Sequence, residues 1–262
     1  MIARSYLYVP GNAPDKLAKV LDRGADAVIV DLEDAVPWVA KESSRATVAE
    51  WLTSLGGDSS GVEVWVRVNP GPLGIEDVEA VVAPGLTGVM VAKTETRAEL
   101  EAVDGALTRA ESAAGLDAGS VAVVPLLESA AALLDARAIA AAPRVVRLQV
   151  GEADLGADLG LGEDADEADW APIRSQVVVV SAAAGISAPV APVSTDFRDL
   201  DRFAATTRAL ARRGYVGRAC IHPAQVAVAN EVFTPTAATL DRARTLVAVF
   251  DEAVAQGRGV VI

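Results

Sequence analysis

Two acidic residues stand at the ends of apolar runs in the middle of the chain. Glu128 closes the run VAVVPLLE, and Asp154 follows RLQVGEA. Two carboxylates provide hard oxygen ligands, which suit Mg²⁺ when water and substrate complete its octahedron. We therefore predict a magnesium site held by Glu128 and Asp154. The alternative is that each carboxylate separately stabilises the N-terminus of a helix that follows it.

Softer metals would lack ligands in this chain. It contains one histidine, His222, and one cysteine, Cys220. Zinc and iron sites are usually built from several such residues. The composition therefore favours magnesium over zinc or iron.

Further polar residues also end apolar runs, namely Asp31, Glu33, Asp34, Arg67, Asn69, Lys93 and His222. Arg67 can bind a carboxylate with two parallel N–H groups while a neighbouring carbonyl oxygen binds the metal. A 2-keto acid has this shape, so it is the expected ligand. In the alternative, Arg67 forms an ion pair with Asp31 or Glu33 on an adjacent strand, and both arrangements can hold at once.

The elements that would carry these residues alternate along the chain. Ala/Leu-rich segments of helical period separate most of eight short apolar runs, at 5–11, 27–34, 62–69, 88–94, 121–129, 144–154, 187–195 and 218–223. Continuous apolar runs are typical of parallel strands covered on both faces. We predict an α/β fold, a single (β/α)8 TIM barrel over residues 1–262, with a doubly wound sheet as the alternative. In such a barrel the residues at the carboxyl ends of the strands converge on one site.

The overall charge and the apolar content limit the classes of function. A formal net charge of −13 argues against nucleic acid as a partner. A single cysteine forms no internal disulfide, and the first residues lack the long apolar stretch of a signal peptide. No run reaches the roughly 18 apolar residues of a membrane span. We expect a cytoplasmic protein that does not contact the membrane.

Six ordered motifs run from about Arg4 to Pro235: SYLYVPGNAPDKLAKVLDRGADAVIVDLEDAVPWVAKESSR, WVRVNP, GVMVAKTE, PLLES, VGEADLGADLG and GYVGRACIHPAQVAVANEVFTPT. Together they closely resemble the citrate lyase β-subunit-like (CitE-like) branch of the HpcH/HpaI aldolase and citrate lyase superfamily. The resemblance implies a (β/α)8 barrel, a Mg²⁺-dependent carbon-carbon lyase acting on CoA thioesters, and a homo-oligomer, with a trimer favoured.

The resemblance also implies roles for individual residues. Glu128 matches the first metal ligand, and Asp154, rather than Glu152 or Asp158, matches the second. Arg67 corresponds to the carboxylate-binding residue of the family. Asp31, Glu33 and Asp34 match the family's DLED signature near the metal waters, and substrate-binding roles are implied for Asp31, Glu33 and Lys93. Tyr8, Asn12 and Lys16, with Arg4 near them, match a CoA-facing surface, so Tyr8 and Lys16 are also expected to bind substrate.

The reaction implied is cleavage or formation of a citryl-, malyl- or citramalyl-CoA type thioester, with a 2-keto acid and an acyl-CoA as the other partners. Two alternatives stay open. A CoA-independent class II pyruvate aldolase usually carries a histidine after its second strand, where this chain has DLEDAV. A non-catalytic ligand-binding or regulatory barrel is the other, because fold does not imply turnover. We assign no general base, and expect His222 to order the loop after the last strand.

A last expectation concerns the C-terminal segment FDEAVAQGRGVVI. In lyases of the family this region typically continues into a lid whose aspartate closes over a neighbouring subunit's site. The printed sequence stops at Ile262, before such a motif. We expect a short or absent lid, with slow or altered turnover of CoA thioesters, since a lid normally excludes water from the reaction.

Overall fold

Eight parallel strands close into a barrel in the computed structural model, which describes residues 2–162 and 164–258. The strands are β1 (Ser5–Pro10), β2 (Ala27–Asp31), β3 (Glu63–Val68), β4 (Gly88–Val91), β5 (Ala122–Leu127), β6 (Gln149–Val150), β7 (Val190–Ala191) and β8 (Gly217–Cys220). Each pairs with its neighbours in sequence, and β1 pairs with β8. The predicted TIM barrel is confirmed, and the closed ring excludes the doubly wound sheet.

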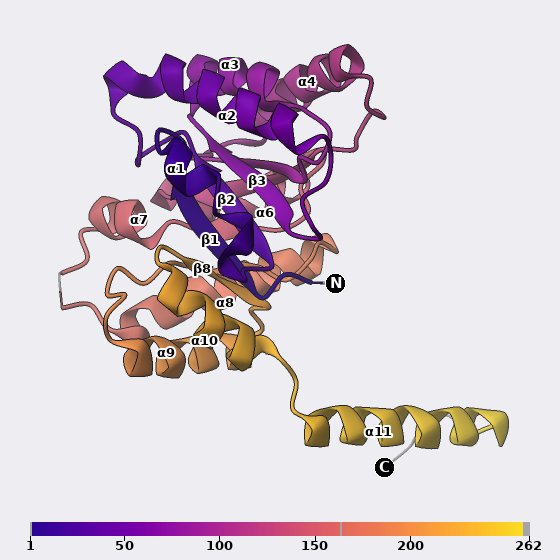
Figure 1. Ribbon diagram of the computed structural model, residues 1–262. Helices are drawn as coiled ribbons and strands as arrows, with labels where there is room; N and C mark the ends of the chain where they lie inside the picture. The colour runs from indigo at the N-terminus through magenta and orange to yellow at the C-terminus, as the bar shows by residue number, and fades with distance from the viewer. Residues whose placement is uncertain (1, 163, 259–262) are drawn as a thin grey trace.

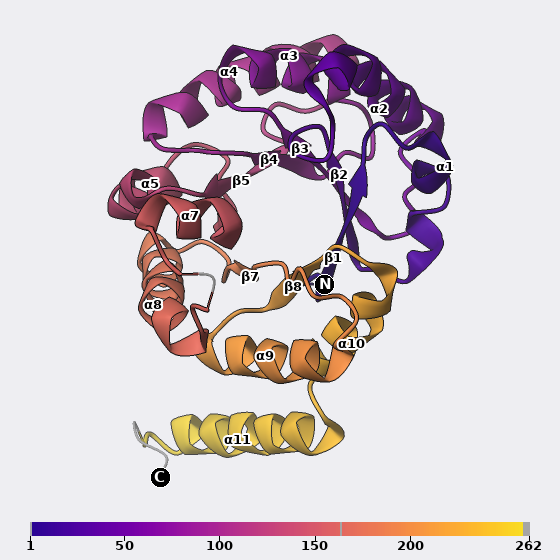
Figure 2. The same cartoon turned by 90° about the vertical axis from the view of Figure 1, so that its left-hand side faces the viewer.

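Helices α1 to α10 surround this ring and α11 lies apart from it, as Figure 2 shows. They are α1 (Pro14–Leu17), α2 (Lys41–Leu55), α3 (Gly71–Val81), α4 (Arg97–Ala114), α5 (Ala130–Leu134), α6 (Ala136–Ala140), α7 (Glu152–Leu159), α8 (Glu167–Ala184), α9 (Leu200–Arg213), α10 (Pro223–Phe233) and α11 (Ala237–Ala255), with 3₁₀ turns η1 (Leu21–Arg23) and η2 (Trp38–Ala40). Side-chain caps fix several starts. Thr96 and Glu99 form a capping box at α4, which satisfies N–H groups that have no partner within the helix.

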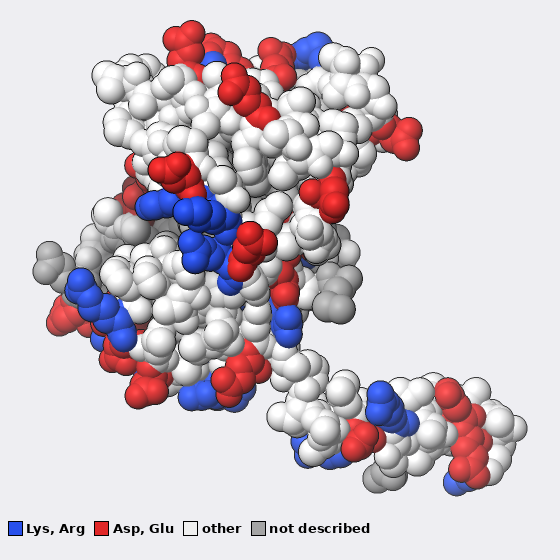
Figure 3. Space-filling view, in the orientation of Figure 1, with Lys and Arg blue, Asp and Glu red and all other residues white. Residues whose placement is uncertain are grey.

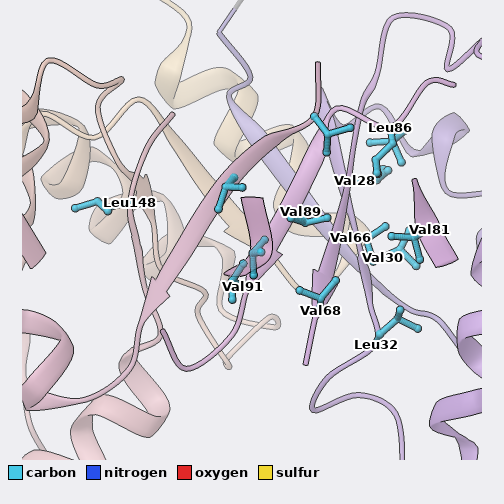
Figure 4. Packing of buried hydrophobic residues seen from close by; sticks show 14 of the residues in the cluster. Val28, Val30, Leu32, Val66, Val68, Val81, Leu86, Val89, Val91 and Leu148 are labelled. Atoms are coloured by element: carbon cyan, nitrogen blue, oxygen red, sulfur yellow. The ribbon is translucent and has the colours of Figure 1, made fainter. Parts of the chain in front are cut away.

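Two layers of apolar side chains hold the barrel together. Valines that face outward from the strands pack beneath the helices, among them Val28, Val66 and Val89 (Figure 4). A smaller cluster that includes Ile29, Trp65 and other side chains fills the inside of the ring. This alternation explains why the strands read as continuous apolar runs, since both faces of each strand are buried.

The sixth and seventh strands are much shorter than predicted. β6 spans two residues of the predicted 144–154, and β7 spans two of 187–195. Val145 makes an isolated bridge to Val123, and α7 begins at Glu152. The boundary at the carboxyl end has a physical reason: acidic residues favour the first turn of a helix. Asp154 therefore lies in the first turn of α7 and not in a strand.

Helix α11 stands away from the barrel (Figure 1). It follows α10 after a short connection, and all its residues are exposed except Ala253. Its exposed side chains include the large apolar ones of Leu240, Leu246, Val247, Val249, Phe250 and Val254. Across the described ranges, no helix combines the length and apolar character needed to span a membrane.

Candidate active site

Glu128 lies at the carboxyl end of β5, in the mouth of the barrel. Its side chain is 7% exposed, and Oε2 accepts a 2.7 Å hydrogen bond from the backbone N–H of Lys93. Within the described part of the chain no ion pair involves Glu128, because the Lys93 ammonium contacts Glu33 and Asp154 instead. Burial raises the pKa of Glu128 to about 7, although the Lys93 N–H and the Arg67 charge oppose this. A buried carboxylate without a counter-charge fits a cation site.

A glycine leaves space for the Glu128 side chain. Gly151 follows β6 next to Glu128, and a Cβ on it would lie 2.3 Å from Oε1 of the glutamate. That separation is too short for any side chain unless Glu128 moves. The G of the GEAD sequence therefore lets the carboxylate lie against β6.

Lys93 contacts four carboxylates, those of Glu128, Glu33, Asp154 and, at 3.5 Å, Asp34. It lies two residues after the end of β4 and has φ 51°, a left-handed conformation that is uncommon for a residue with a side chain. This conformation directs its N–H to Glu128, while its Nζ lies 2.5 Å from Glu33 and 3.3 Å from Asp154. Such strained residues often lie at functional sites. Lys93 and Glu33 thus lie together at the mouth of the barrel; that they bind substrate stays a prediction.

Glu152 and Asp154 of α7 both line the cavity that Glu128 lines. Glu152 accepts two hydrogen bonds from Arg174, of 2.6 and 2.8 Å, and Asp158 accepts one from the N–H of Ala130. Across residues 2–162 and 164–258, Asp154 is not paired with an arginine, and its charge raises the pKa of Glu128. That Asp154 binds the metal, as the resemblance implies, stays a prediction.

The helix-capping alternative does not apply to Glu128. Ser129 caps α5, since its side chain accepts the N–H of Ala132. No group of three or more metal-ligating side chains occurs among the residues the structure describes. A site of two carboxylates suits Mg²⁺, which usually keeps several waters and takes further ligands from substrate.

Arg67 is held by the end of the neighbouring strand. Its Nε and Nη2 donate to the two oxygens of Asp31 at 2.7 and 2.5 Å, and Nη1 lies 3.1 Å from Glu33 and 3.4 Å from Asp34. The ion pair foreseen as the alternative is confirmed. Asp31 occupies one edge of the guanidinium. A substrate carboxylate would therefore have to hydrogen-bond to the remaining N–H groups of Arg67.

Asp31 acts through this pairing. Besides Arg67, its oxygens accept the N–H groups of Glu33 and Ala35. These contacts place Arg67 and bend the chain after β2. Direct contact between Asp31 and substrate stays a prediction.

A second layer of polar residues fixes the loop after β2. Asn69 is buried and donates to the Leu32 carbonyl at 3.0 Å and to Asp77 at 2.6 Å. Arg45 in turn donates to Asp77 at 2.8 Å, and Lys41 donates to the carbonyls of Leu32 and Glu33. Asn69 is thus a positioning residue.

The mouth encloses a cavity of about 420 Å³. Charged residues line it at the top, including Arg67, Glu128 and Asp154. Its other walls include Tyr8, Leu126, Gln149, Val193 and Ile221. This volume is in the range of small-molecule sites.

The predicted CoA-facing segment is divided by the fold. Tyr8 lines the cavity, with the Arg67 guanidinium 5.2 Å above its ring, and Asn12 and Lys16 follow β1 as exposed residues. Arg4 precedes β1 and binds Asp26. The prediction for Arg4 was therefore wrong, because β1 runs from one end of the barrel to the other and Arg4 lies at the end opposite the site.

His222 has the structural role expected of it. Nδ1 accepts the N–H of Ala224, which caps α10, and its ring stacks on Phe197 with centroids 4.8 Å apart. Ile221, next to it, lines the cavity instead.

Comparison with known proteins decides the family. The family described as HpcH/HpaI aldolase/citrate lyase matches residues 4–223. The chain belongs to this family. Within it, a citrate lyase subunit beta-like protein of Deinococcus radiodurans is 36% identical, over 98% of this chain and 89% of its own. An L-malyl-CoA/beta-methylmalyl-CoA lyase of Cereibacter sphaeroides is 30% identical, over 99% of this chain and 87% of its own.

Solved structures of the family agree in fold. A citrate lyase beta subunit from Mycobacterium tuberculosis complexed with oxaloacetate and magnesium is 27% identical, with a TM-score of 0.70 over 88% of this chain and 97% of that one. The CitE protein of the same organism in complex with magnesium, acetoacetate and coenzyme A has a TM-score of 0.72 at 27% identity, over 93% of this chain and 85% of that one.

Several residues around the site could not be identified from the sequence. Lys41 and Arg45 lie four residues apart at the start of α2, a spacing typical of a solvated helix face. Asp77 lies within α3 and is buried. In the sequence, the only indication that these residues belong to the site is their position after the DLED and RVN segments. Gln149 was read as part of an apolar strand.

Proposed function

We propose that this protein is a Mg²⁺-dependent carbon-carbon lyase that cleaves a hydroxyacyl-CoA thioester into a 2-keto acid and an acyl-CoA, or catalyses the reverse condensation. The observation that carries the proposal is the buried, uncompensated carboxylate of Glu128, which shares one cavity with Asp154 and Arg67. Membership of a family of citrate and CoA-ester lyases supports it.

The residues of the site would divide the work. Mg²⁺ held by Glu128 and Asp154 would act as a Lewis acid on the oxygen that becomes the keto group. Arg67, oriented by Asp31, would offset the charge of the substrate carboxylate. Lys93 contacts Glu128 through its backbone N–H and Asp154 through its ammonium group. These contacts would fix the positions of the two proposed metal ligands relative to each other.

We place the CoA phosphates near the start of the chain. Lys16, Lys19 and Arg23 are exposed in and after α1, which follows the mouth end of β1. Figure 3 shows a group of basic side chains over this part of the molecule. Asp15 and Asp22 are also exposed in this stretch, so its three basic and two acidic side chains leave a formal charge of about +1 in a chain of net charge −13. The basic side chains would suit an anionic ligand.

With Mg²⁺, we expect turnover of at least one of citryl-, malyl- and citramalyl-CoA, because the site holds groups for both the cation and the keto acid. Keto-acid release is measured with a coupled dehydrogenase assay, and EDTA should abolish it. Pyruvate with an aldehyde, without CoA, serves as the comparison. Turnover of that pair alone would contradict the CoA assignment, and no turnover and no keto-acid binding would contradict the proposal as a whole.

We also propose that the protein is a homo-oligomer, with a trimer favoured. The exposed apolar side chains of α11 recur at helical spacing, with Leu246, Phe250 and Val254 four residues apart. A contiguous exposed apolar face typically marks a protein interface. A second copy of the chain would cover it.

A charge placed on this face should dissociate the oligomer. We expect the Leu246→Glu/Phe250→Glu variant to run as a monomer where wild type runs as an oligomer, because two carboxylates would be buried unpaired in the interface. Light scattering after size exclusion measures the mass. Val39→Glu, at an exposed apolar residue of η2, is the matched control. A monomeric wild type, or an unchanged mass in the double variant, would contradict the assignment.

A further inference from the structure

A buried amide in the cavity has no partner. Gln149 is 2% exposed and lines the cavity, yet its Oε1 makes no hydrogen bond to any residue of the described ranges. Burying a polar group unpaired is unfavourable. Gln225 shows the usual arrangement: it is equally buried, and its Oε1 accepts the N–H groups of Ile221 and His222. Gln149 therefore differs from a glutamine that serves the fold alone.

The strand register places Gln149 below the charged residues. It pairs with Leu126, two residues before Glu128 on β5, and lies two residues before Gly151 on its own strand. Alternate residues of a strand face the same side, so Leu126 and Gln149 form the next inward layer. Two residues of strand correspond to about 6.6 Å. A substrate group that extends about 6.6 Å from Glu128 into the barrel would therefore contact the Gln149 amide.

Several of the side chains that line the cavity with Gln149 carry no charge. We call Tyr8, Leu126, Gln149, Val193 and Ile221 the cavity floor. Its polar groups are the Gln149 amide and the Tyr8 hydroxyl, and burial raises the pKa of Tyr8 so that the phenol stays neutral. An alkyl group would leave Oε1 unpaired, and a carboxylate can only accept, so it would offer Oε1 no proton. A hydroxyl group can donate to Oε1 and also accept from the amide or the phenol.

We propose that Gln149 is a specificity residue that receives a hydroxyl group on the carbon chain of the 2-keto acid. The inference rests on the proposed function and narrows its substrate class to hydroxyl-bearing 2-keto acids. A buried donor or acceptor selects for the ligand that satisfies it, because the ligand lacking that group leaves it unpaired.

Two keto acids of nearly equal size test the proposal. 3-Hydroxypyruvate and 2-oxobutyrate differ by a hydroxyl in place of a methyl group. With Mg²⁺ present, we expect isothermal titration to give about tenfold tighter binding of 3-hydroxypyruvate to the wild type, the effect of one satisfied hydrogen bond. In Gln149→Met, which keeps the length and volume of the side chain, this ratio should fall to about one. Gln176→Met, at an exposed position on α8, should keep the wild-type ratio.

Stability gives a second measurement. If the amide awaits a ligand, Gln149→Met should melt at the same temperature as the unliganded wild type or higher, because an unpaired polar group is removed. A clearly lower melting temperature would overturn the proposal, since the amide would then be stabilising the fold itself. Gln149→Leu repeats the test with a different shape.

The failures can be told apart. Wild type that binds pyruvate with Mg²⁺ but shows the same ratio as Gln149→Met overturns the role of Gln149 and leaves the proposed function intact. Wild type that binds none of the keto acids overturns both.

Discussion

The Glu128→Gln variant is expected to lose Mg²⁺-dependent turnover by about a thousandfold or more, because a Lewis-acid metal is worth several kcal/mol to the transition state. Glutamine has almost the same shape but no charge, so the barrel should stay folded. Glu128 lies buried beside Gly151 without a counter-charge. Removing that charge should keep or raise the melting temperature of the unliganded protein. Lower activity with equal or higher stability is the signature of a residue kept for function.

Two aspartates of α7 provide a test and a matched control for the second proposed metal ligand. Asp154→Asn should lose metal-dependent binding of oxaloacetate or glyoxylate in isothermal titration, as Glu128→Gln should. Asp158→Asn lies one turn later on the same helix, where its carboxylate accepts the Ala130 N–H, and should bind as the wild type does. Unchanged ligand binding in both ligand variants would disprove the metal assignment.

The barrel could be predicted because its cause is local. Each strand is covered on both faces, so each reads as an apolar run, and β2 and β3 end at Asp31 and near Arg67, where the polar residues begin. The lengths of β6 and β7 could not be predicted, since a two-residue strand held by its neighbours has no periodicity of its own.

The contacts of the site were less predictable than its residues. Which atoms of Arg67 are taken by Asp31 depends on register across two strands 36 residues apart in sequence. The left-handed backbone of Lys93, which turns its N–H toward Glu128, has no sequence signal in a residue other than glycine. Gln149 was hidden in an apolar run, because one amide among valines and leucines does not change the period of a strand.

The other substitution with a large expected effect is Arg67→Lys. The contacts of the Arg67 guanidinium in the structure give the physical reason for this expectation. In Arg67→Lys we expect affinity for oxaloacetate to fall by about a hundredfold, although the charge is kept, because a hydrogen bond to a charged group contributes about 1.5–3 kcal/mol. The guanidinium places two N–H groups on Asp31 and a third nitrogen toward Glu33. An ammonium cannot hold Asp31 in this way and also present a donor to substrate.

A second arginine, which is half-buried, separates binding from stability. Arg144 precedes β6 and binds Glu111 at 2.6 Å and Asp104, outside the cavity lining. Arg144→Lys also breaks a planar pairing, so it should lower the melting temperature without changing the dissociation constant of oxaloacetate with Mg²⁺. Arg67→Lys should change both. Equal oxaloacetate affinity in wild type and Arg67→Lys would mean that Arg67 serves only to hold Asp31, because the substrate carboxylate would then be bound by other groups.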